Sequence, residues 1–97
     1  LLDGVPCPDK VEFNGLANPA VQEELDRLPP EVDTLLLCGV ETHICVWQTG
    51  AAALSAGYRV QVVADAVSSR TRENHRYGLE RLDRAGAVIA PAEMIVY

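Results

Sequence analysis

The sequence lacks several features that define common classes of protein. No apolar run approaches the roughly 20 residues that a membrane-spanning helix needs, and no segment is typical of a secretory signal peptide. Basic clusters are also missing, since 8 Lys and Arg stand against 14 Asp and Glu, for a net charge of −6. Nucleic acids and anionic membranes bind basic surfaces, so neither is expected as a partner.

Cysteine is scarce and irregularly placed. The three cysteines form no CxxC pair and no spacing typical of a disulfide framework. Reduced thiols are therefore the simplest interpretation, and they favour a cytoplasmic location. His, Cys and acidic residues nowhere group at ligand spacing, so the sequence predicts neither a metal site nor a bound cofactor.

The chain is short but apolar enough to fold. Its 97 residues allow one small domain, and 48% of them are hydrophobic, which excludes a disordered chain. No repeat or linker divides residues 1–97, and residues 1–10 hold Gly4, Pro6 and Pro8, which predict a loop. The sequence starts at Leu1 without a Met, so we expect a single partial domain cut from something longer.

Helical and apolar segments alternate along the chain. Asn18 and Pro19 indicate the start of a helix, and Gly57 and Gly86 indicate the ends of two later ones. The predicted helices span residues 19–28, 44–56 and about 71–85, with a fourth opening at residue 91, and the predicted strands span residues 34–38, 60–64 and 87–90. This order is typical of a parallel sheet between helices, a three-layer α/β/α sandwich of Rossmann-like type. Three strands are too few to cover themselves, so N-terminal strands are expected to be missing from the chain.

Residues 39–46 are the stretch around which the other segments are arranged. They follow the apolar strand at residues 34–38, and they place Cys45 in the first turn of the next helix. Parallel sheets bind ligands at the carboxyl ends of their strands. The amides and dipole of a helix start stabilise an anion, so a thiol there is favoured as a thiolate. Cys45 is therefore a candidate nucleophile.

A longer block of motifs resembles a known family. Residues 39–46, Gly-Val-Glu-Thr-His-Ile-Cys-Val, are followed by Val62-Val63-Ala64-Asp65-Ala66, Ser68-Ser69-Arg70 and Glu80-Arg81-Leu82. With this spacing the chain resembles the second half of an isochorismatase-like cysteine hydrolase, in the branch of isochorismatase domain-containing proteins. The resemblance covers residues 34–97 and implies an isochorismatase-like hydrolase fold.

The resemblance implies a catalytic Cys, Lys and Asp. The Cys corresponds to Cys45. The Lys precedes an aromatic residue in the family, and Lys10 before Phe13 fits that pattern, with Asn14 in place of the usual Ser. The Asp would end a strand upstream of Leu1, and neither Asp3 nor Asp9 matches its position.

The loop before the cysteine also has an expected role. The resemblance implies a cis peptide bond between Val40 and Glu41, and an oxyanion hole formed by the amides of Glu41 and Cys45. Val40, Glu41 and Thr42 are thus assigned to the oxyanion loop, while His43 and Phe13 are candidates for substrate contact. A direct pair of His43 with Cys45 is disfavoured, because residues two apart on a helix point to different faces.

Other chemically capable residues have structural interpretations. Cys38 ends an apolar strand and is expected in the core, and Cys7 is expected to be inert in a loop. Asp65 is expected to cap amides near Ser68. The remaining predictions are packing or interface roles for His75 and Trp47 and a bracing role for Thr49.

Three functions remain open on the sequence alone. The first is a cysteine hydrolase of an amide or related C–N bond in a small molecule, in which an isolated chain without the Asp would have little activity. The second is a non-catalytic assembly module, and either is expected to form a homo-oligomer. The third, a nucleotide binder, lacks the glycine-rich phosphate loop, since Gly39 stands alone in its turn.

Overall fold

The computed structural model describes residues 3–97, so the first two residues of the predicted N-terminal loop lie outside the described range. The described part is a small α/β unit built on three parallel strands in the order β1-β2-β3. The strands are β1 (Thr34–Val40), β2 (Arg59–Ser68) and β3 (Val88–Ala90). The helices are α1 (Pro19–Asp26), α2 (Trp47–Ser55), α3 (Arg72–Ala85) and α4 (Ala92–Val96), with a short 3-10 turn η1 (Gly15–Ala17) and a π-helical turn η2 (Thr42–Val46).

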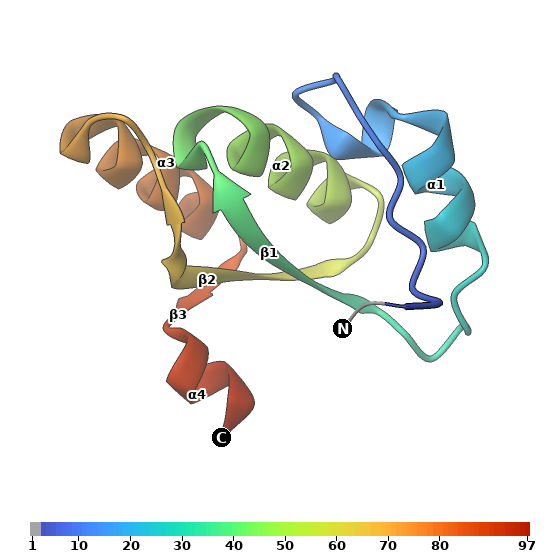
Figure 1. Cartoon of the computed structure of the whole chain (residues 1–97). Coiled ribbons are helices and arrows are strands. Elements are labelled where there is room, and N and C mark those ends of the chain that lie inside the picture. The colour runs from blue at the N-terminus through green and yellow to red at the C-terminus, as the bar shows by residue number, and fades with distance from the viewer. Residues whose placement is uncertain (1–2) are drawn as a thin grey trace.

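Figure 1 shows how the layers are arranged. Helices α2 and α3 lie side by side over one face of the sheet. Helix α4 lies on the other side of the sheet and contacts β2. The predicted alternation of helices and strands and the three-layer α/β class are therefore confirmed. No helix among residues 3–97 is long and apolar enough to cross a membrane.

Local sequence signals explain several helix ends. Asn18 caps α1 as predicted, because its side chain accepts hydrogen bonds from the amides of Ala20 and Val21. Gly86 ends α3 at a φ of 110°, where a residue with a side chain would be strained. The N-cap of α3 is Thr71, whose side chain accepts a hydrogen bond from Asn74 N, and Ser68 is the last residue of β2.

The core lies between the sheet and the pair α2 and α3. Leu82 of α3 is fully buried against apolar side chains of β2 and α2, and the core residues are Val46, Ala53, Val60, Val62, Val67, Leu82 and Ala87. Gly50 allows the close approach of the two helices, since a Cβ there would lie 2.6 Å from Leu82 Cδ2. Trp47 is half-buried against this core, as predicted.

Two predictions about strands are wrong. Within the described residues β1 is covered on one face only, since Leu35 and Leu37 pack on the core beneath α2 and α3. Leu36 (55% exposed), Cys38 and Val40 (67%) are exposed. Cys38 is accordingly not a core residue. Asp65 does not cap amides near Ser68, since its Oδ1 accepts a hydrogen bond from Ala92 N at 2.8 Å and so holds the start of α4.

Candidate active site

Cys45 lies in a helical turn just beyond the carboxyl end of β1. The turn, η2, is a wide π turn rather than the α-helical turn that the sequence predicts, and Val46 N donates to Glu41 O five residues back. α2 continues directly from it at Trp47. The peptide bond between Val40 and Glu41, which joins β1 to this turn, is cis.

A cleft of about 330 Å³ opens beside Cys45. Cys45 is half-buried in the wall of the cleft, and Lys10, from the N-terminal segment, also lines it. Leu37, Cys38, Gly39 and Val40, the carboxyl end of β1, form another part of the wall. The structure therefore brings together Cys45, Lys10 and the strand end in one cleft, which is the place where open parallel sheets bind ligands.

The segment that carries Lys10 is tied to α2 through Thr49. The Thr49 hydroxyl accepts a hydrogen bond from Gly15 N at 2.9 Å and lies 3.5 Å from Phe13 O, to which it donates. Lys10 Nζ donates to the carbonyl of Glu12 at 2.9 Å, so the ammonium folds over its own loop. Thr49 thus has the bracing role that the sequence predicts.

Phe13 and His43, the two candidates for substrate contact, do not line this cleft. The Phe13 side chain is 59% exposed and contributes only its carbonyl to the contact with Thr49. His43 lies on the other side of the turn, beside Trp47 and Arg81, and its Nδ1 shares a hydrogen bond with Ser69 Oγ at 2.8 Å. His43 therefore supports the turn rather than reaching into the cleft.

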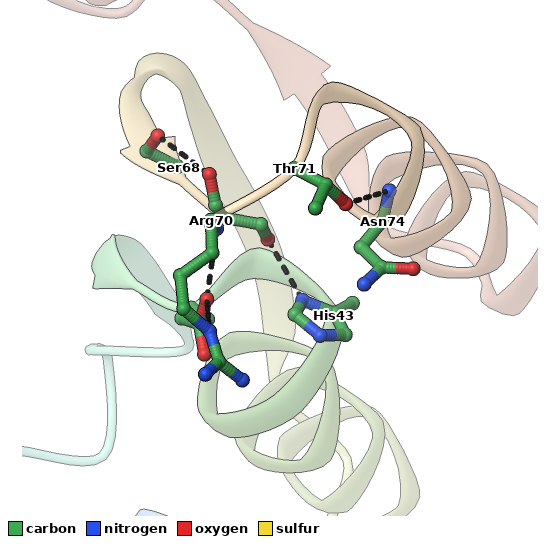
Figure 2. A network of polar contacts seen from close by, with 7 residues as sticks. His43, Ser68, Arg70, Thr71 and Asn74 are labelled. Atoms are coloured by element: carbon green, nitrogen blue, oxygen red, sulfur yellow. Dashed lines mark hydrogen bonds and ion pairs between the residues drawn. The ribbon is translucent and has the colours of Figure 1, made fainter.

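The acidic residue at the start of the turn is paired with Arg70. Glu41 Oε1 accepts hydrogen bonds from Arg70 N at 2.8 Å and from Arg70 Nε at 3.1 Å (Figure 2). The Arg70 amide, assisted by the guanidinium charge, holds the pKa of Glu41 below its ordinary value. Glu41 is therefore a carboxylate at neutral pH, and its side chain points toward Arg70.

The next residue, Thr42, is fully buried and is held from α3. Its Oγ1 lies 2.8 Å from His75 Nδ1 in a shared hydrogen bond. The sequence predicts a packing or interface role for His75, and it does not predict this polar contact across 33 positions. No group of three or more His, Cys, Asp and Glu that could hold a metal occurs within residues 3–97.

The parallel sheet between layers of helices, with a cleft at its carboxyl edge, defines the class as a three-layer α/β sandwich. The isochorismatase domain matches residues 1–94, and the chain belongs to this hydrolase family. It is 44% identical over 89 residues to the secreted isochorismatase effector Isc1 of Phytophthora sojae, a match that covers 92% of this chain and 42% of the relative. The chain thus spans less than half the length of this curated relative.

Solved structures show the same fold. The MAR1 ribonuclease of Caenorhabditis elegans superposes with a TM-score of 0.80 at 32% identity, over 91% of this chain and 43% of that one. The pyrazinamidase/nicotinamidase of Streptococcus mutans gives a TM-score of 0.74 at 36% identity, over 84% of this chain and 44% of that one. These matches confirm the family that the sequence motifs indicate.

Proposed function

We propose that this chain carries the nucleophile of a cysteine hydrolase that acts on an amide or related C–N bond of a small molecule. The observation that carries the proposal is the cleft lined by Cys45 and Lys10 at the carboxyl end of β1. The cleft volume, about 330 Å³, is in the range of small-molecule sites. The nicotinamidase neighbour, whose substrate is an amide, supports the bond type.

The proposed reaction has two steps. The Cys45 thiolate attacks the carbonyl carbon, and the C–N bond breaks as the amine leaves with a proton. Water then attacks the thioester, and the acid is released as the thiol is restored. The amides of Glu41 and Cys45 are assigned to the developing oxyanion, and the Lys10 ammonium is assigned to stabilise negative charge in the cleft. The proton relay is assigned to no residue of this chain.

An activated ester separates the nucleophile from the proton relay. With p-nitrophenyl acetate the leaving p-nitrophenolate needs no proton. Cys45 should therefore become acetylated even if the chain hydrolyses amides slowly or not at all. We expect a burst of p-nitrophenolate that Cys45→Ala abolishes and Cys38→Ala preserves. A burst that survives Cys45→Ala would overturn the proposal, as would acetylation that peptide mass spectrometry finds equally on all three cysteines.

A second candidate function is a non-catalytic assembly module. The row of exposed apolar side chains on β1, Leu36 and Val40, favours it, because an edge strand with apolar side chains pairs readily with another chain. Sedimentation of the wild-type chain and of Leu36→Lys tests this candidate. A concentration-dependent oligomer that Leu36→Lys dissociates, together with the absence of a Cys45 burst, would favour assembly over catalysis.

A further inference from the structure

Glu41, which precedes the Cys45 turn, and the first two residues of the turn, Thr42 and His43, are each held by the same distant segment. Glu41, Thr42 and His43 contact Arg70, His75 and Ser69 respectively, through the side-chain hydrogen bonds at 2.8 to 3.1 Å. Their partners all lie in residues 69–75, which form the β2–α3 connection and the first turn of α3. Figure 2 shows Arg70 on this connection and the imidazole of His43 beside it, and the hydrogen bond to that imidazole is shared with Ser69 Oγ.

The backbone of α3 supports the same turn from beneath. A Cβ at Gly78 would lie 2.8 Å from the carbonyl carbon of Thr42 and 2.9 Å from His43 Cα and N. Such distances essentially never occur, so only glycine allows α3 to approach the turn this closely. The close contact at Gly78 fixes the distance between the turn and α3. The contacts of Glu41, Thr42 and His43 fix the orientation of the turn.

We propose that residues 69–75, together with Gly78, position Cys45 for attack, with Ser69 and Arg70 as positioning residues. None of these residues lines the Cys45 cleft, so they act through Glu41, Thr42 and His43. The proposal rests on the proposed function, since it assigns a support to the same nucleophile. Holding a reacting group in place is worth large factors in rate, and a misplacement of about 1 Å can cost about a hundredfold.

The test compares the burst rates of variants with p-nitrophenyl acetate at pH 7. Arg70→Ala removes an 81% exposed side chain and so leaves the fold intact. We expect Arg70→Ala and Ser69→Ala each to slow the Cys45 burst at pH 7 by about threefold, and the pair by about tenfold.

The matched controls come from the same chain. Arg76→Ala breaks a second exposed ion pair on α3, that of Arg76 with Glu80 at 3.0 Å. The Arg76 side chain donates to Glu80 rather than to the Cys45 turn, so this variant should leave the burst unchanged. Arg70→Lys, which restores a cation opposite Glu41, should recover most of the rate. Labelling of the exposed Cys7 in every variant reports any general change in the chain.

Two outcomes separate this inference from the proposed function. A wild-type burst on Cys45 that the Ser69→Ala/Arg70→Ala variant keeps within twofold would overturn the positioning role and leave the nucleophile intact. The absence of any wild-type burst on Cys45 would overturn the proposed function itself. Equal losses in Arg76→Ala and Arg70→Ala would also overturn the positioning role, because they would show an effect of surface charge alone.

Discussion

The buried pair of Thr42 and His75 gives the sharpest prediction about stability. Thr42 is fully buried and His75 is half-buried, so water reaches the two partners unequally. His75→Leu leaves the Thr42 hydroxyl buried without its partner, which costs about 1–3 kcal/mol of unfolding free energy. Thr42→Val keeps the shape of the side chain and leaves only the more accessible imidazole nitrogen of His75 without a partner. A loss of about 1 kcal/mol of unfolding free energy is therefore expected.

Urea denaturation measures both effects. With a slope of about 1–3 kcal/mol per molar urea, His75→Leu should lower the midpoint by roughly 1 M and Thr42→Val by less. The double variant leaves neither partner orphaned, so it should lose less than the sum of the two single variants. Thr34→Val is the control, since Thr34 donates to Asp33 at an exposed site and should lose almost nothing. Strict additivity, or a larger loss from Thr42→Val than from His75→Leu, would show that the buried unpaired hydroxyl does not set the cost.

Further predictions concern helix packing, pH and capping. Gly50→Ala should lower the unfolding free energy by about 1–3 kcal/mol, measured by thermal denaturation, because the new Cβ would meet Leu82, and a gain in stability would contradict the close packing. Glu41 has a lowered pKa in the folded protein, so the unfolded chain binds more protons near pH 4 and stability rises with pH there. The stability that Glu41 contributes is complete above the ordinary pKa of glutamate and is lost as pH falls through the lowered pKa. Glu41→Gln should therefore flatten this part of the curve of unfolding free energy against pH. An unchanged slope would exclude the contact between Glu41 and Arg70 as its cause. Thr71→Ala removes the acceptor for Asn74 N and should cost about 1 kcal/mol in urea denaturation, whereas no loss would mean that the cap is replaced by water.

Local patterns predicted most of the architecture. The Asn18 cap, the glycine stop at Gly86 and the apolar runs are signals within a few residues, and they placed the helices and strands in the right order. The error at Cys38 has a different origin. A continuous apolar strand indicates burial on both faces, but the pattern alone does not tell which layers are present to cover it.

The sequence predicts the residues that line the cleft, but it does not predict the contacts that hold the Cys45 turn. The position of Cys45 follows from one strand and one helix start, and the motif spacing indicated Lys10 across the cleft. The partners of Thr42 and His43 lie 33 and 26 positions away, and no periodicity links such residues. Ser69 and Arg70 belonged to the motif block, yet their contacts with the Cys45 turn required the folded connection between β2 and α3.

Labelling of the three cysteines with iodoacetamide at pH 7 tests whether Cys45 is the nucleophile. Cys7 and Cys38 are exposed, whereas Cys45 is half-buried in the cleft wall, so exposure and chemistry predict opposite orders. We expect Cys45 to be labelled fastest, as peptide mass spectrometry would show, because it lines the proposed reactive cleft together with Lys10. Labelling that follows exposure, with Cys45 slowest, would contradict its assignment as the nucleophile.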